Sequence, residues 1–258
     1  IPAVLSFLVE RHVRSKQAAA LSARATPYRP EPVKTRDRAL LVFCTITACA
    51  ILVMIGMAVF ASLATYWPYK LAPSLKNYDF GNMDGGGWGS YFNSLRLAMC
   101  AAVAGAFATF ISAYLVEKPR HFGLPRELLN LLANLPLAVP GLVLGVGYIF
   151  FFISPSNPLR AIYGSMTILV VCTVAHFFSV AHLTSLTALR QLDREYELVS
   201  ESMGVPFWRT LWRVHLPVAL PTVLNVGGYF FVNAMTTVSA VVFLYSPQTT
   251  LAAIAVLN

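Results

Sequence analysis

Charged residues are scarce in this sequence. Asp, Glu, Lys and Arg make up 12% of the 258 residues, whereas hydrophobic residues make up 57%, and the mean hydropathy is +0.65. A soluble domain carries about 25% charged residues. So few charges cannot cover a surface that faces water, and the same composition excludes a disordered or collagen-like chain. We therefore expect most of the chain to lie in a lipid bilayer.

Signatures of metal, redox and catalytic sites are also lacking. The four cysteines include no C-x-x-C pair, and their spacing fits neither a zinc site nor a disulfide framework. The glycine-rich run at 84–89 is not a P-loop, because the chain contains no Gly-Lys pair. Neither G-x-S-x-G nor H-E-x-x-H occurs. We expect no catalytic residue, no metal and no cofactor in this chain.

Acidic residues are absent from the apolar stretches. All eleven Asp and Glu residues lie in loops or at the ends of those stretches, whereas ion-coupled transporters usually need an ionisable group within the membrane. The histidines well inside a stretch are His176 and His182, and they are six residues apart in the sequence, so they do not share a helix face. Polar packing between helices is the favoured interpretation, and a proton relay is the alternative. An ion-coupled secondary transporter or channel is thus the weaker functional hypothesis, and an inert membrane scaffold is a third.

Five apolar stretches are long enough to span a membrane. A helix needs about 20 apolar residues to cross the bilayer core, and the candidates are 39–65, 90–116, 128–152, 161–186 and 214–245. Residues 249–258 begin a sixth span or form a short interfacial helix. The expected fold is an all-α polytopic transmembrane helix bundle with five complete spans.

The basic residues predict the orientation of these spans. Fifteen of the nineteen Lys and Arg residues lie in 10–38, 117–127 and 187–213. The positive-inside rule places these three segments in the cytoplasm. The net charge of +8 therefore reports topology, and no nucleic-acid partner is expected. We expect residues 1–38 to be the end of an upstream segment followed by a proline-bearing tether, and residues 39–258 to be the membrane core without its last span.

Two groups of residues within the spans have special chemistry. Pro136 and Pro140 predict a kink in the third span, and Gly141 lets a neighbouring helix approach closely, so these three residues are candidates for a gate. The uncharged polar residues of the fifth span include Asn225, Asn233, Thr236, Thr237 and Ser239. They make hydrogen bonds between helices or form the polar lining of a solute path, and both interpretations stay open.

The segment 187–213 predicts a short amphipathic helix between two spans. Its apolar positions recur at spacings of four, three and four, and they are Leu192, Tyr196, Val199 and Met203. The acidic residues of another face are Asp193, Glu197 and Glu201. Gly204 is placed to end this helix and Pro206 prevents its continuation. Such a helix rests on the lipid surface or docks into a partner protein.

This segment resembles the EAA motif of permease subunits of binding-protein-dependent ABC importers. That motif has Glu-Ala-Ala, three residues, Gly, nine residues, an aliphatic residue, one residue, and then Leu-Pro. The matching residues are Gly204, Val214, Leu216 and Pro217. The Glu-Ala-Ala positions depart from the motif, and they hold Leu198, Val199 and Ser200. Glu197 stands one place earlier.

The resemblance implies the permease core of a type I ABC importer in the bacterial inner membrane. Its partners would be a dimer of ABC ATPase subunits that bind ATP and Mg²⁺, an external solute-binding protein, and a second permease core, as a homodimer or a fused half. In such permeases the loop is a coupling helix that docks on the ATPase. The residues expected to couple to the ATPase are Glu195, Tyr196, Glu197, Val199, Ser200, Met203, Gly204, Leu216 and Pro217.

Two further stretches narrow the resemblance. Residues 136–148 and 236–246 are similar to the branch of the family that imports ferric iron, polyamines, thiamine and 2-aminoethylphosphonate. Within that branch the chain most resembles the 2-aminoethylphosphonate permeases. Members of that group often fuse two six-span cores in one chain, and residues 1–9 would suit the end of a first core. The expected solute is 2-aminoethylphosphonate or a related small charged molecule.

Overall fold

The computed structural model describes residues 33–79, 87–119 and 123–256. These residues belong to two compact units, one within 24–83 and one within 84–258. The segments expected upstream, and the tether up to residue 32, lie outside the described residues.

The smaller unit consists of one long helix and a short hairpin. Its elements are α2 (Lys34–Leu63), β1 (Ala64–Tyr66), β2 (Lys70–Pro73) and the 3-10 turn η1 (Lys76–Tyr78). The two strands pair antiparallel. At about 1.5 Å per residue, the 30 residues of α2 exceed the thickness of a bilayer core. The helix is apolar on all sides, which is typical of a membrane span, and it matches the first predicted span.

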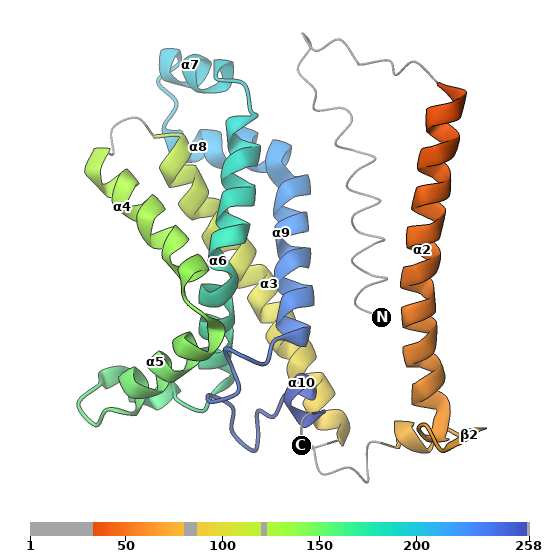
Figure 1. Ribbon diagram of the computed structural model, residues 1–258. Coiled ribbons are helices and arrows are strands. Elements are labelled where there is room, and N and C mark those ends of the chain that lie inside the picture. The colour runs from red at the N-terminus through yellow and green to blue at the C-terminus, as the bar shows by residue number, and fades with distance from the viewer. Residues whose placement is uncertain (1–32, 80–86, 120–122, 257–258) are drawn as a thin grey trace. The chain divides into compact units, whose positions relative to one another are not determined.

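Three long helices form the larger unit. They are α3 (Gly87–Glu117), α6 (Met166–Arg190) and α9 (Leu216–Thr236), and each packs against the other two (Figure 1). A short helix α8 (Phe207–Thr210) and a π-helical turn η5 (Leu211–His215) lead into α9. Helix α3 approaches α9 closely at Gly105, where an added Cβ would lie 2.7 Å from the Phe230 ring. The helices α3 and α6 match the second and fourth predicted spans.

The third predicted span is broken. Residues 128–152 do not form one helix but belong to α4 (Gly123–Asn134), the 3-10 turn η3 (Leu135–Ala138) and α5 (Gly141–Ile153). The axes on the two sides of the break differ by 111°. Pro136 lies within η3 and Pro140 directly precedes α5. Each proline lacks the N–H that would continue the helix. The predicted kink is confirmed, and it is sharp enough to divide the segment into two helices.

Glycines allow α5 to pack closely on the segment that follows α9. An added Cβ at Gly141 would lie 2.5 Å from Ser239 Oγ, and one at Gly145 would lie 2.7 Å from the Ala240 carbonyl oxygen. These contacts confirm the expected role of small residues in close packing.

The fifth predicted span ends early. Its helix stops at Thr236, and residues 237–250 form irregular turns before the short helix α10 (Ala252–Ala255). The prediction of a span up to Tyr245 is therefore wrong at that end. Ala240, Val241 and Leu244 are fully buried in the bundle, and non-helical backbone is tolerated in a membrane protein where protein surrounds it.

Among the described residues, four helical stretches are long and apolar enough to cross a membrane. They are Lys34–Leu63, Gly87–Glu117, Met166–Arg190 and Phe207–Thr236. The broken pair of α4 and α5 makes a fifth crossing if it is one span, and it is otherwise a re-entrant loop. The fold is an all-α bundle of the multi-pass membrane class.

Candidate functional site

A short helix stands at one end of the bundle, between α6 and α8. This helix, α7 (Glu195–Ser202), connects through residues 191–194 and 203–206, and we call residues 191–206 the α7 loop. Figure 1 shows α7 beside α8 and beyond the ends of α3 and α6. It is the amphipathic helix that the sequence predicts.

Gly204 ends α7 in the expected manner. Its φ is +65°, in the left-handed region that glycine adopts without steric cost. The Val205 N–H donates to the Ser200 carbonyl at 2.9 Å, and the Gly204 N–H donates to the Glu201 carbonyl at 3.1 Å. This pair of hydrogen bonds is a Schellman motif. An added Cβ at Gly204 would meet no atom within 4 Å, so the backbone conformation, and not space, requires glycine here.

The outward side of the α7 loop and of the start of α8 is apolar and exposed. We call it the outer face, and its members are Leu198, Val199, Met203, Phe207 and Trp208, all about half exposed or more. The predicted stripe is only partly on this face. Val199 and Met203 belong to it, whereas Leu192 is half-buried before the helix begins. The Tyr196 ring lies edge-on against His215, with ring centroids 6.3 Å apart.

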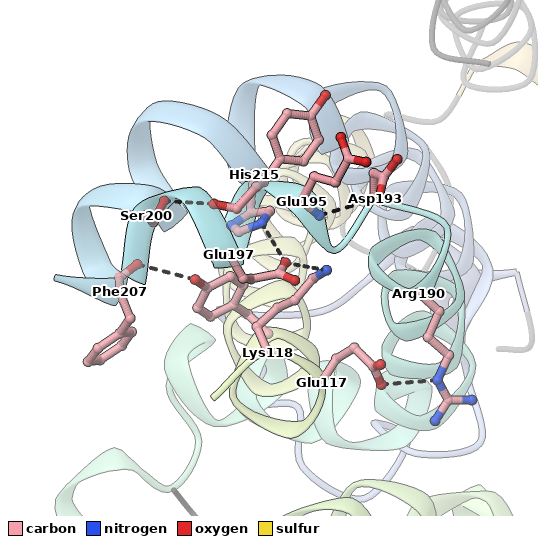
Figure 2. A network of polar contacts seen from close by, with 11 residues as sticks. Glu117, Lys118, Arg190, Asp193, Glu195, Glu197, Ser200, Phe207 and His215 are labelled. Carbon is pink, nitrogen blue, oxygen red and sulfur yellow. Dashed lines mark hydrogen bonds and ion pairs between the residues drawn. The ribbon is translucent and has the colours of Figure 1, made fainter. Parts of the chain in front are cut away.

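The inward side of α7 carries one carboxylate. Glu197 Oε1 lies 2.6 Å from Lys118 Nζ and 3.0 Å from His215 Nε2, as Figure 2 shows. The exposed fractions of these side chains are 16% for Glu197, 7% for Lys118 and 0% for His215. A charge shielded from water needs such partners. The residues of the predicted acidic face therefore differ in their surroundings. Glu197 is largely buried and paired, whereas Asp193 and Glu201 are exposed.

His215 takes this position through the π-helical turn. Pro217 cannot donate a hydrogen bond to Arg213, and its ring disfavours a regular helix there. The turn η5, which contains Arg213, widens instead, as π-helical turns inside helices do. A carboxylate only accepts hydrogen bonds, so the Nε2 of His215 carries the proton that it donates to Glu197. Leu216 and Pro217 begin α9 directly after this turn.

The end of α3 contacts the α7 loop and its flanks at several points. The Tyr114 hydroxyl donates to the Phe207 carbonyl at 3.2 Å, and Glu117 pairs with Arg190 at 3.0 Å. Glu117 thus contacts Arg190, the last residue before the loop, and Lys118 contacts Glu197 in its middle (Figure 2). Tyr114 contacts Phe207, the first residue after the loop. Sequence reasoning missed Tyr114, Lys118 and His215. No local pattern could have found them, because their partners are distant along the chain.

The candidate path residues do not gather in one place. Asn225 and Asn233 line an otherwise apolar groove of about 1100 Å³ formed by α3, η5 and α9. The other three lie outside that lining. Thr236 is exposed at the end of α9, Thr237 is buried, and Ser239 lies at the broken span.

The broken span brings Gly141, one of the three candidate gate residues, to the irregular segment after α9. Gly141 faces both Ser239 and His176, whose Nε2 would lie 3.1 Å from an added Cβ. Their role in a path or gate stays a prediction.

The two histidines of α6 pack between helices. His182 is fully buried, and its Nδ1 lies 2.8 Å from Ser112 Oγ of α3. This contact fits the polar-packing interpretation. Within residues 33–79, 87–119 and 123–256, no group of three or more His, Cys, Asp or Glu residues is placed to hold a metal ion.

Comparison with known proteins identifies relatives over most of the chain. It is 34% identical over 197 residues to the putative ferric transport system permease protein FbpB 1 of Haemophilus influenzae, covering 75% of this chain and 30% of that protein. It is 31% identical to the ferric transport system permease protein FbpB of Actinobacillus pleuropneumoniae, covering 79% and 29%. The chain thus spans about a third of the length of these two relatives.

A third relative is matched over most of its own length. The putative 2-aminoethylphosphonate transport system permease protein PhnV of Salmonella paratyphi A is 25% identical, with 79% of this chain and 76% of that protein covered. Among solved structures, a bacterial ABC transporter involved in the import of the acidic polysaccharide alginate shares the fold. Its TM-score is 0.62 at 16% identity, with 90% of this chain and 82% of that chain covered.

A family match covers the part of the chain that contains the α7 loop. The family described as binding-protein-dependent transport system inner membrane component matches residues 105–257, more than half of the sequence. This chain belongs to the family of inner membrane components of binding-protein-dependent transport systems.

Proposed function

We propose that this chain is the translocating subunit of an ATP-driven importer and that the α7 loop binds a separate ATPase. One observation carries the proposal: α7 exposes apolar side chains on its outer face while Glu197 fixes its inner side to the bundle. Exposed apolar patches on rigid elements mark sites of protein association. Membership of the family supports the same role.

In the proposed mechanism the ATPase supplies the energy and this chain supplies the path. Two ATPase subunits bind ATP and Mg²⁺, and their closure moves α7. The movement of α7 is transmitted to the membrane-spanning helices. The spans then alternate between outward-open and inward-open states. A solute-binding protein delivers the solute, and a second core, in the same chain or another, completes the path. The α7 loop faces the cytoplasm in this arrangement.

The solute that the relatives favour is ferric iron. Two relatives at 34% and 31% identity are named ferric permeases, whereas the relative named for 2-aminoethylphosphonate is 25% identical. We therefore place ferric iron first, ahead of the phosphonate that the sequence resemblance suggested. The phosphonate stays the second candidate because that relative is matched over 76% of its length.

Uptake by the reconstituted complex tests the proposal. The full-length chain would be placed in liposomes with its ATPase and binding protein, and uptake of radioactive ferric citrate and of 2-aminoethylphosphonate would be measured with and without ATP. We expect ATP-dependent uptake of the iron complex. Uptake of the phosphonate alone would reverse the order of the two solutes. Flux of either solute that needs no ATP would support an ion-coupled transporter or channel and contradict the proposal.

A further inference from the structure

A shielded ion pair connects α7 to the bundle. Helix α7 joins its neighbours through two short linkers, 191–194 and 203–206, and an eight-residue helix held only by linkers would pivot when pushed. Glu197 prevents this, because a single carboxylate oxygen contacts Lys118 at the end of α3 and His215 in η5.

Because this contact is buried, losing one of its partners costs more than losing a partner of the neighbouring exposed ion pair. Lys118 is 7% exposed and Glu197 is 16% exposed, so removing either partner leaves the other charge poorly solvated. The pair of Glu117 and Arg190 joins the same helix end to α6, but the Arg190 side chain is 59% exposed. Exposed pairs of this kind contribute little.

Few titratable side chains surround this contact in the described part of the chain. Within the described residues, Lys118 directly after α3, Glu197 of α7 and His215 of η5 meet there, with the Tyr114 hydroxyl directed to the Phe207 carbonyl nearby. Glu195 and Glu201, the other acidic residues of α7, are exposed. Neither Lys118 nor Glu197 belongs to the outer face, so changing them leaves the side chains of the proposed ATPase-binding surface unchanged.

We infer that Lys118 is a positioning residue that fastens α7 to α3, so that a displacement of α7 is transmitted to α3 as well as to its chain neighbours α6 and α9. The inference rests on the proposed function for its transport consequence, although the fastening itself does not. Breaking the contact should leave the ATPase bound and hydrolysing ATP while less solute moves for each ATP.

The test uses the full-length chain with its ATPase in proteoliposomes. The variants are Lys118→Met, which keeps the apolar stem, Glu197→Gln, and the exchange Lys118→Glu with Glu197→Lys. Arg190→Met is the matched control, since it removes an exposed cation from an ion pair at the same end of α3. Two quantities are measured: solute imported per ATP hydrolysed, and hydrogen exchange of the α7 amides in the absence of the ATPase.

We expect both single variants to lower the import per ATP by about tenfold or more and to speed α7 exchange by a similar factor. The ATPase should still co-purify, the exchanged pair should recover most of both quantities, and Arg190→Met should resemble the unmodified protein. A merely structural role would lower the amount of protein but not the import per ATP.

Several outcomes would overturn the inference. They are unchanged exchange of α7 in both single variants, unchanged import per ATP, and an exchanged pair no better than the single variants. If the single variants do not insert, the exchanged pair decides, because its recovery requires direct contact of the two side chains. If the unmodified chain binds no ATPase, the proposed function fails, and hydrogen exchange still decides whether Lys118 fastens α7.

Discussion

Replacing Gly204 by alanine should loosen α7 by an amount that the backbone geometry sets. With φ at +65°, Gly204 lies in the left-handed region, where a residue with a Cβ costs about 1 kcal/mol. An added Cβ would meet no atom within 4 Å, so no steric cost adds to this figure. About 1 kcal/mol corresponds to roughly a fivefold change in an equilibrium constant.

Hydrogen exchange followed by mass spectrometry measures this change in the peptide that contains α7. We expect its amides to exchange about fivefold faster in Gly204→Ala. The increase should be smaller in Gly204→Asn, because asparagine tolerates the left-handed region better. Gly147→Ala is the matched control: its Cβ also meets open space, but its φ is not in the positive range.

The reasoning fails if Gly204→Ala leaves the exchange of α7 unchanged. It also fails if Gly147→Ala speeds that exchange as much, because backbone strain at Gly204 would then not be the cause. An asparagine variant worse than the alanine variant would point to side-chain size instead of conformation.

Two other substitutions test the packing and the electrostatics of the bundle. Gly105→Ala should lower stability by about 1–3 kcal/mol, because its Cβ would lie 2.7 Å from the buried Phe230 ring; thermal unfolding in detergent measures this, and Phe230→Leu in the same chain should restore part of the loss. Arg190→Ala should change stability by less than about 1 kcal/mol, because its pair with Glu117 is exposed; a larger loss in the same assay would show that this pair, too, fastens the loop.

Hydropathy predicted the membrane helices well because the signal is local. The predicted 90–116 and the observed α3 (Gly87–Glu117) differ by three residues or fewer at each end. Hydropathy did not predict where the helix ends at Thr236. The residues that follow are apolar because they are buried, and hydropathy does not distinguish a buried helix from buried irregular backbone. Pro136 and Pro140 indicated a kink, but the bend of 111° depends on how α5 packs against residues 239–240.

For the site, too, local features could be predicted from the sequence, and contacts between distant segments could not. The end of α7 at Gly204 followed from a pattern of a few residues, and the structure confirms it. The partners of Glu197 did not follow from such a pattern, because Lys118 comes directly after α3 and His215 lies in the turn that leads into α9. Only the folded chain brings these three residues together.

The most direct test of the account is whether the outer face of the α7 loop holds the ATPase. Met203→Glu introduces a charge at a side chain that is 72% exposed, and Leu75→Glu, at a residue equally exposed in the other unit, is the matched control. The full-length chain would be purified in mild detergent, and the accompanying proteins would be quantified by mass spectrometry. We expect a stoichiometric P-loop ATPase with the unmodified and Leu75→Glu chains, and a loss of about tenfold or more with Met203→Glu. Retention of the ATPase by Met203→Glu, or no ATPase with the unmodified chain, would contradict the account.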